Sequence, residues 1–274
     1  MTVELGVLAA HVPSICHREN VPNFQEEMVN TMDNVTKKIA EVNPDAIVLI
    51  SCHWISTFNH YVDVSSNHEG VLTAFECPDI ISDVKYKHPG DKELGKEIVN
   101  AGKRAKLPVI PVDDPTYVWD YGTVVPLRYF SQNADIPVVN LSITMAASLE
   151  ETYKWGEAIR DVLDNSNKRI VFIASGALAH KLVRGRHHMP TKAERALDNQ
   201  FIDYLLNKDM GAAKEMLPQY ANAAEVEGGG RHLAMLLGII NEDYSPSFLS
   251  YAQSSGSGNA IMTFEPVKSL QESR

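Results

Sequence analysis

The most constraining feature of this sequence is a nearly unbroken apolar run, Asp45-Ala-Ile-Val-Leu-Ile-Ser-Cys-His-Trp54. A segment that is apolar on both faces is typical of a central strand in a largely parallel sheet covered on both sides. Open α/β sheets bind ligands at the carboxyl ends of their strands, so we expect His53 at that edge. Two more apolar segments lead to histidines, from Val3 to His11 and from Arg169 to His180. Three histidines at one sheet edge predict a metal or proton-transfer site.

The composition is that of one large α/β domain. A chain of 274 residues with 44% hydrophobic residues can bury a substantial core, and nothing in the sequence divides it in two. We therefore predict a single domain over residues 1–274, with roughly the last 8 residues as a flexible tail.

Charge and cysteine usage exclude several classes of partner. The 25 Lys and Arg residues against 35 Asp and Glu residues give a formal charge of -10, without a basic block, so nucleic acid and anionic membranes are not expected partners. The odd, scattered set Cys16, Cys52 and Cys77 argues against a disulfide scaffold. Apolar runs reach only about 10 residues, whereas a membrane span needs about 20, and no signal peptide is evident. We expect a cytoplasmic protein.

Hydrophobic periodicity and capping residues predict the local elements. Helices are expected over residues 23–42, 93–105, 124–130, 149–165, 191–206, 211–216 and 231–240. Strands are expected over 46–50, 59–64, 71–75, 108–111, 136–144, 169–175, 247–253 and 260–264, besides the first apolar segment. Residues 67–70 are predicted as a turn, and 83–90 and 113–121 as loops.

Two of the histidines and one glutamate are the candidates for a metal site. Non-haem Fe(II) centres that must bind both O2 and an organic substrate use two histidines and one carboxylate and leave other positions open. His11 and His53 are the strand-end candidates, and Glu227 stands before three glycines that permit a sharp bend. Each signal alone has a plainer explanation: a histidine in a core or loop, and a glutamate at a solvated helix start.

Several stretches together resemble the class III extradiol ring-cleavage dioxygenases, the protocatechuate 4,5-dioxygenase beta-subunit-like group. The similarity is strongest to the branch with the 3,4-dihydroxyphenylacetate 2,3-dioxygenases and 2-aminophenol 1,6-dioxygenases, and its motifs recur in order over nearly the whole chain. They are His11-Val-Pro-Ser14, His53-Trp54, Glu69-Gly-Val-Leu-Thr73, Tyr121-Gly-Thr123 with Pro126 and Arg128-Tyr129, Ala174-Ser-Gly-Ala-Leu-Ala-His180, Met216-Leu-Pro218 with Tyr220-Ala221, Glu227-Gly228, Met235-Leu-Leu-Gly238 and Ser254-Ser-Gly-Ser-Gly258.

The resemblance implies a fold, a cofactor and a ligand set. The fold would be a three-layer α/β/α sandwich with a mixed, largely parallel central sheet, which agrees with the pattern of elements. Fe(II) would be bound by His11, His53 and Glu227, and His180 would be the acid/base histidine. The expected partners are a small catechol or aminophenol and O2, and the expected assembly is a homo-oligomer, a dimer or a tetramer.

Tyr121 departs from the wider family. Many class III members have a histidine before Gly-Thr, whereas Tyr121 stands there, as in the dihydroxyphenylacetate and aminophenol branch. A phenol could donate a hydrogen bond to substrate or O2, but its pKa of about 10 makes it a poorer base than histidine. This strengthens His180 as the base, while a purely packing role for Tyr121 stays open.

Other groups have less defined roles. The stretch Arg184-Gly-Arg186-His187-His188 could bind a substrate carboxylate or be a solvated, mobile loop. Arg231 and His232 could support the site or lie on a helix surface. Cys52 is expected to be a buried filler rather than a ligand. Trp54 and Tyr129 could wall an aromatic pocket or belong to the core.

The sequence as a whole favours an Fe(II)-dependent extradiol dioxygenase of aromatic catabolism. It would cleave a catecholic ring beside the diol, with 3,4-dihydroxyphenylacetate or a near relative as preferred substrate. The alternatives are the catalytic subunit of a 2-aminophenol 1,6-dioxygenase, a non-catalytic Memo-like metal-binding interaction protein, and a zinc hydrolase. The complete histidine and glutamate set disfavours the Memo-like function, and no additional carboxylate is placed to activate water for a hydrolase.

Overall fold

A central sheet of eight strands organises the computed structural model, which describes residues 3–132 and 135–267. The strand order is β6-β3-β7-β2-β8-β1-β10-β9, and a separate sheet pairs β4 with β5. The strands are β1 (Leu5–Ala9), β2 (Ala46–Ser56), β3 (His60–Asp63), β4 (Asn67–Leu72), β5 (Val84–Pro89), β6 (Val109–Val112), β7 (Val138–Thr144), β8 (Ile170–Ser175), β9 (Tyr244–Ser254) and β10 (Ser257–Pro266). The predicted C-terminal tail lies outside the described residues, apart from its first position.

The sheet is mixed, as predicted. Strands β7, β2, β8 and β1 pair in parallel, and β10 and β9 extend this set by antiparallel pairing. On the other edge, β3 joins β7 antiparallel. The carboxyl ends of β1, β2 and β8 therefore meet at one edge of the sheet.

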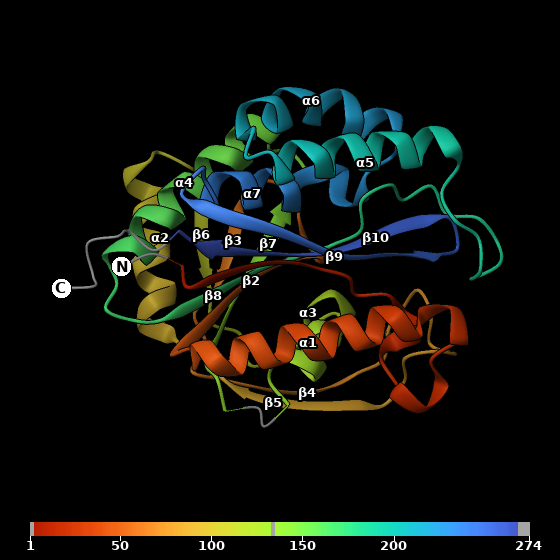
Figure 1. Ribbon diagram of the computed structural model, residues 1–274. Coiled ribbons are helices and arrows are strands. Elements are labelled where there is room, and N and C mark those ends of the chain that lie inside the picture. The colour runs from red at the N-terminus through yellow and green to blue at the C-terminus, as the bar shows by residue number, and fades with distance from the viewer. Residues whose placement is uncertain (1–2, 133–134, 268–274) are drawn as a thin grey trace.

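Helices cover both faces of the sheet and complete a three-layer sandwich (Figure 1). One face carries α1 and α3, with the β4–β5 hairpin beyond them, and the other carries α2, α4, α7, α5 and α6. The helices are α1 (Glu26–Val42), α2 (Lys92–Arg104), α3 (Tyr121–Phe130), α4 (Leu149–Asn165), α5 (Lys192–Leu206), α6 (Met210–Ala223) and α7 (Arg231–Ile239). The predicted α/β/α architecture is confirmed.

Strand β2 shows why the apolar run must be covered on both sides. Its alternate residues Ala46, Val48 and Ile50 enter the core under α2, α4 and α7, while Ile47 and Leu49 enter the core under α1 and α3. Burying a Leu or Ile side chain contributes about 1.5–3 kcal/mol, so both faces of β2 stabilise the fold.

Capping chemistry fixes several helix starts where the sequence predicted them. The Ser148 side chain accepts a hydrogen bond from the Glu151 backbone N–H at the start of α4. Thr191 and Glu194 form a reciprocal capping box at the start of α5. The short helix predicted over 211–216 instead continues to Ala223.

The β4–β5 hairpin corrects two predictions. Residues 67–70, predicted as a turn, begin β4, and residues 83–90, predicted as a loop, contain β5. In β5 the exposed Lys85 and Lys87 alternate with the buried Tyr86 and His88, which is a strand period hidden by its polar composition. The hairpin buries one face and leaves the other in water.

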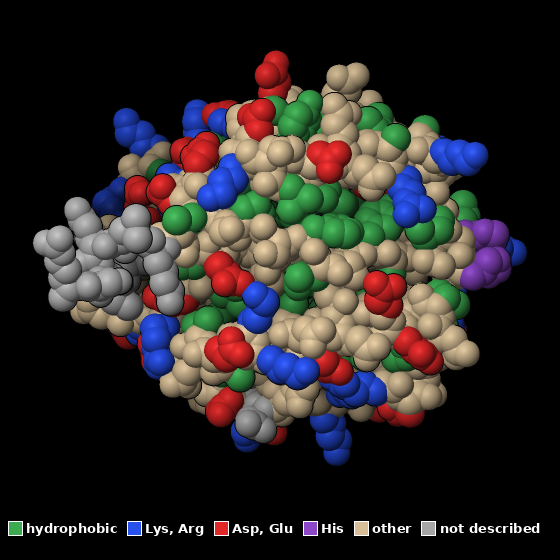
Figure 2. Space-filling view, in the orientation of Figure 1, with side chains coloured by type: hydrophobic (Ala, Val, Ile, Leu, Met, Phe, Trp, Pro, Cys, Tyr) green, Lys and Arg blue, Asp and Glu red, His purple; other side chains and the backbone are tan. Residues whose placement is uncertain are grey.

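Charged side chains of both signs are interspersed on the face shown in Figure 2, without a continuous basic area there. A bilayer-spanning helix is absent from the described part of the chain, where every helix lacks the required length or apolar character.

Candidate metal centre and adjoining cavity

Three side chains from distant parts of the chain converge at the carboxyl edge of the sheet. His11 lies two residues past β1, His53 lies in β2, and Glu227 opens a short 3-10 turn, Glu227–Gly230. One ligand atom of each residue lies within 4.8 Å of the other two. The Nε2 atoms of His11 and His53 lie 3.0 Å and 3.1 Å from the same Glu227 Oε1. The candidate metal-binding side chains are thus brought together with their donor atoms facing one point.

A bulge in β2 aims His53 at this point. The strand does not end before His53, as the sequence prediction had it, but continues to Ser56. Its pairing with β7 jumps from Ser51 to Ile55, which leaves Cys52, His53 and Trp54 without partners in the β7 ladder. Bulges of this kind re-aim side chains beside functional sites.

The glycines after Glu227 shape the third arm of the centre. Gly228, Gly229 and Gly230 adopt φ angles of 58°, 64° and 77°, the left-handed region in which a Cβ is unfavourable. A Cβ on Gly228 would also approach the Cys52 sulfur to 3.1 Å. The Glu227 Oε2 accepts a hydrogen bond of 2.5 Å from the Ala177 backbone N–H, so the carboxylate is oriented from both of its oxygens.

Hydrogen bonds select the tautomer of His11. Its Nδ1 lies 2.9 Å from Ser175 Oγ, and that hydroxyl donates its own proton to the Gly122 carbonyl at 2.6 Å. The hydroxyl must therefore accept from His11 Nδ1–H, which leaves the Nε2 lone pair directed at the centre.

A carboxylate also lies beside His53, in ion-pair contact with its other ring nitrogen. The Glu76 Oε1 lies 3.3 Å from His53 Nδ1, on the side of the ring opposite Glu227. A carboxylate on the Nδ1 side of the ring favours a proton there, which would leave Nε2 to bind a cation. The sequence assigned no role to Glu76, which lies outside the family motifs, or to Ser175, which lies within the Ala174–His180 motif but has a side chain with no distinctive chemistry.

The histidines around Glu227 favour the ionised form of its carboxylate. Burial alone would raise the pKa of Glu227, but His11, His53 and His180 around it hold that pKa well below its usual range. Burial opposes protonation of His53, yet the hydrogen bond and charge of Glu227 leave the pKa of His53 raised. An ionised carboxylate that faces two imidazole Nε2 atoms fits a divalent cation such as Fe(II), which would displace the protons that these nitrogens share with the carboxylate.

His180 lies beside this group without joining it. Its Nε2 is 3.6 Å from Glu227 Oε1, and its backbone N–H donates to the Ala224 carbonyl at 3.2 Å. Burial lowers the pKa of His180 below its ordinary value, so the ring is neutral at neutral pH. A neutral imidazole at the edge of a cavity can accept a proton.

Tyr121 is the first residue of α3, where the Asp120 side chain caps the helix by accepting from the Thr123 backbone N–H. Its ring centroid lies 3.9 Å from that of His53. Burial raises the pKa of Tyr121, so the phenol stays protonated and can act only as a hydrogen-bond donor or a packing group.

Other residues that the sequence singled out lie around the centre or outside the cavity. Cys52 is buried, as expected of a filler. Arg231 donates to the Gly228 and Ala147 carbonyls, both at 3.0 Å, and so braces the glycine turn. Trp54 stacks on Tyr117 with centroids 4.6 Å apart, and neither Trp54 nor Tyr129 is among the cavity-lining residues.

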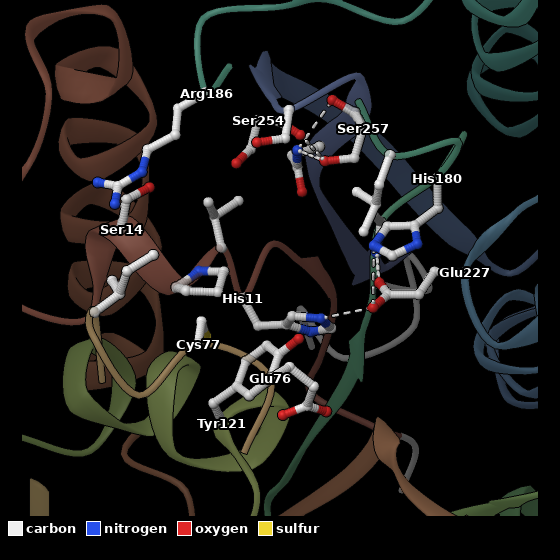
Figure 3. A pocket seen from close by; sticks show the side chains of 17 residues that line it. His11, Ser14, Glu76, Cys77, Tyr121, His180, Arg186, Glu227, Ser254 and Ser257 are labelled. Atoms are coloured by element: carbon white, nitrogen blue, oxygen red, sulfur yellow. Dashed lines mark hydrogen bonds and ion pairs between the residues drawn. The ribbon is translucent and has the colours of Figure 1, made fainter. Parts of the chain in front are cut away.

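A cavity of about 230 Å³ opens beside the centre. His11, Tyr121, His180 and Glu227 line one part of it, and Arg186 with Ser14 lies across from His180 and Glu227 (Figure 3). Further walls come from Val12, Pro13, Glu76, Cys77, Ile80, Ala177, Leu182, Ser254, Ser255, Ser257 and Asn259. A cavity of about 150 Å³ can hold benzene, so this one has room for a substituted ring.

Comparisons with known proteins bear on this site. Residues 5–265 match the family model described as the catalytic LigB subunit of aromatic ring-opening dioxygenase. The chain is 26% identical over 254 residues to a 3,4-dihydroxyphenylacetate 2,3-dioxygenase of Escherichia coli, covering 87% of this chain and 90% of the relative. It is 25% identical over 287 residues to a 2-aminophenol 1,6-dioxygenase beta subunit of Pseudomonas sp., covering 96% and 94%.

The fold also occurs among solved structures. The crystal structure of an uncharacterized protein from Escherichia coli K12 superposes with a TM-score of 0.66 at 19% identity, covering 96% of this chain and 99% of that one. At that identity the likeness concerns the fold alone.

Proposed function

The chain belongs to the family of catalytic LigB subunits of aromatic ring-opening dioxygenases and is a ring-cleavage dioxygenase, and from this premise we propose the details of its chemistry. It uses Fe(II), bound by His11, His53 and Glu227, to cleave a catecholic ring beside its diol. The preferred substrate is 3,4-dihydroxyphenylacetate or a near relative, and both atoms of O2 enter the product.

The observation that carries the proposal is the convergence of two imidazole Nε2 atoms on one carboxylate oxygen at 3.0 Å and 3.1 Å. Two histidines and one carboxylate on one side of a cation are the donor set of non-haem Fe(II) oxygenases. When bound, Fe(II) would hold diol and O2 together and provide a path for electrons from the ring to O2. The cavity beside the centre offers the space for that ring.

His180 supplies the proton transfer. The substrate's hydroxyl must lose a proton when the ring binds, and the ring nitrogen of His180 can accept it because burial keeps the imidazole neutral. The same nitrogen can return the proton during ring cleavage. Tyr121 stays protonated and would donate a hydrogen bond to an oxygen atom of the substrate or of O2.

A 2-aminophenol is the second candidate substrate. This second candidate is supported by the similarity to the Pseudomonas beta subunit, which spans 96% of this chain. A vicinal hydroxyl and amine would present two adjacent donor atoms, as a diol does.

For either substrate we propose that the protein is a homo-oligomer, which light scattering after gel filtration would test.

Oxygen uptake tests the proposal. Anaerobically purified, Fe(II)-loaded protein is supplied with a panel of catechols and aminophenols while O2 and the absorbance of a yellow ring-opened product are followed. Stoichiometric uptake with one compound supports the reaction and selects the substrate. No uptake with any member, in protein that holds ferrous iron, would contradict it.

Two glutamates two residues apart provide a matched pair of variants. Glu227→Gln removes the shared carboxylate and is expected to abolish both iron binding and uptake. Glu225→Gln alters an exposed side chain 3.6 Å from Lys181 and should leave both intact. Full iron content in the Glu227 variant would remove that residue from the ligand set.

A further inference from the structure

The two ends of the cavity differ in chemistry. At one end His11, Glu227 and His180 form the centre described above. At the other, the Arg186 side chain lies beside Ser14, across the cavity from His180 and Glu227 in Figure 3. Apolar side chains, including Ile80 and Leu182, contribute to the lining. A ring whose diol faces the centre would therefore direct a substituent on its far side toward a guanidinium.

The charge of Arg186 is available to a ligand. No Asp or Glu oxygen among the described residues lies within 4.0 Å of its guanidinium nitrogens. By contrast, Arg18 is paired with Asp33, and Arg128 donates from Nε to the Cys16 carbonyl at 2.8 Å. Arg186 also lines a smaller adjoining pocket with His17, Asn20 and Asp79, so its side chain borders both spaces.

The backbone of the Arg186 loop is anchored although its side chains are exposed. Ser255 N–H donates to the Arg186 carbonyl at 3.2 Å, and Gly256 N–H donates to the His188 carbonyl at 2.9 Å. Val183 N–H donates to the Ser255 carbonyl at 2.7 Å. These bonds fix residues 183–188 to the turn between β9 and β10, which lowers the entropic cost of presenting the guanidinium.

We propose that Arg186 binds the carboxylate of an anionic side arm on the substrate and so selects catechols or aminophenols that carry one. This inference rests on the proposed function, because it places the diol at the His11, His53 and Glu227 centre. A guanidinium matches a carboxylate with two parallel N–H donors, and a neutral substituent would leave those donors unmatched. The cavity's volume beyond that needed for a bare ring accommodates a short arm.

The test compares two substrates and two variants. Turnover of 3,4-dihydroxyphenylacetate and of neutral 4-methylcatechol is measured for the unaltered enzyme, Arg186→Met and Arg184→Met. Arg184 is the matched control, because it is exposed on the same loop and is not among the residues lining the cavity. Thermal melting of each variant verifies that it folds.

Arg186→Met should lower kcat/KM for the acid roughly 10- to 100-fold, the range of a charge-assisted hydrogen-bond loss, chiefly through KM. Turnover of 4-methylcatechol and both activities of Arg184→Met should stay within about 2-fold of the unaltered enzyme. Arg186→Glu should shift preference from the acid toward the cationic catechol dopamine. Equal loss for both catechols, or no loss for the acid, would overturn the proposal.

A binding measurement separates failure of this inference from failure of the proposed function. Calorimetric titration with phenylacetate, which carries the anionic arm without a diol, needs no turnover. Binding that weakens about 10-fold or more in Arg186→Met would support the subsite even in a protein that cleaves no ring. The subsite would be refuted if turnover does not depend on Arg186 and phenylacetate binding does not depend on it either. Binding is independent of Arg186 if the unaltered protein and Arg186→Met bind phenylacetate equally well or not at all.

Discussion

His180 differs from the other two histidines of the site in how its ring is held. The His11 ring is hydrogen-bonded to Ser175 and the His53 ring is in ion-pair contact with Glu76, and the Nε2 atom of each ring faces Glu227. The His180 ring borders the cavity, as the His11 ring does, but its Nε2 is farther from the carboxylate, at 3.6 Å. This difference supports our proposal that His11 and His53 bind the cation while His180 exchanges a proton with a ligand in the cavity.

We therefore expect His180→Ala to retain iron and lose turnover. General acid–base catalysis contributes about 10²- to 10⁴-fold, so kcat should fall by at least about 100-fold while iron stoichiometry is unchanged. Iron analysis and oxygen uptake on one preparation measure both. His188→Ala, an exposed histidine further along the same loop, is the matched control and should behave as the unaltered enzyme. Near-normal turnover of His180→Ala would remove His180 from the mechanism.

The residues of the centre differ in how far sequence could predict them. His11, His53 and Glu227 could be named because strand ends and a glycine run mark them, and because the family motifs contain them. Glu76 could not be named, since it lies in a stretch whose contact with His53 exists only in the folded chain. For Arg186 the sequence left two alternatives, a residue that binds a substrate carboxylate or one in a solvated loop, because sequence does not distinguish a cavity wall from an exposed loop.

At the scale of elements, the centre depends on two backbone irregularities. The bulge in β2 turns His53 out of the ladder, and the left-handed glycines after Glu227 turn the chain back toward α7. Helix starts were predictable because caps such as Ser148 and Thr191 act locally. The bulge was not predictable, because it is a mismatch between β2 and its neighbour β7, more than 80 residues away.

Gly228→Ala tests the glycine turn. A left-handed φ of 58° costs a non-glycine residue about 1–2 kcal/mol, and the new Cβ would approach the Cys52 sulfur to 3.1 Å. We expect lower thermal stability and a larger loss of iron affinity, because Glu227 must shift. In Gly211→Ala, within α6, the nearest atom to the new Cβ is Asp209 Oδ1 at 3.7 Å, and no such loss is expected. Unaltered iron affinity in Gly228→Ala would contradict this account of the turn.

At the scale of the molecule, the fold brings three segments to one edge by ordering its strands as β2-β8-β1. Sequence predicted a largely parallel, covered sheet, because β2 and β8 are apolar on both faces. The sequence did not predict this strand order. Apolar strands resemble one another in sequence, and which of them pair depends on the connecting loops and on side-chain packing in the folded chain. The hairpin of β4 and β5 was missed because its charged face obscured the alternation.

An ion pair at the opposite edge links β2 to β8. Arg169 donates from Nη2 to Asp45 Oδ1 at 2.9 Å and from Nε to Oδ2 at 3.1 Å. These bonds lower the pKa of Asp45 from 3.8 to about 2. Because the folded-state pKa is the lower one, the contribution to stability is complete above pH 3.8 and is lost as the pH falls toward 2.

Asp45→Asn measures that contribution. The pair is partly exposed, so the variant should be less stable by no more than about 1 kcal/mol near neutral pH. In urea unfolding from pH 6 downward, the difference from the unaltered protein should shrink below about pH 4. A difference that is constant over this range would show that Asp45 acts through something other than its charge.

The most direct test of the central claim is the fate of labelled oxygen. Fe(II)-loaded protein is allowed to react with its best catechol under ¹⁸O₂, and the ring-opened product is weighed by mass spectrometry. We predict that a single product molecule carries both labelled atoms, after allowance for exchange of the carbonyl oxygen with water. A product without label, or one with its new oxygen drawn from water, would contradict ring cleavage by a dioxygenase at the His11, His53 and Glu227 centre.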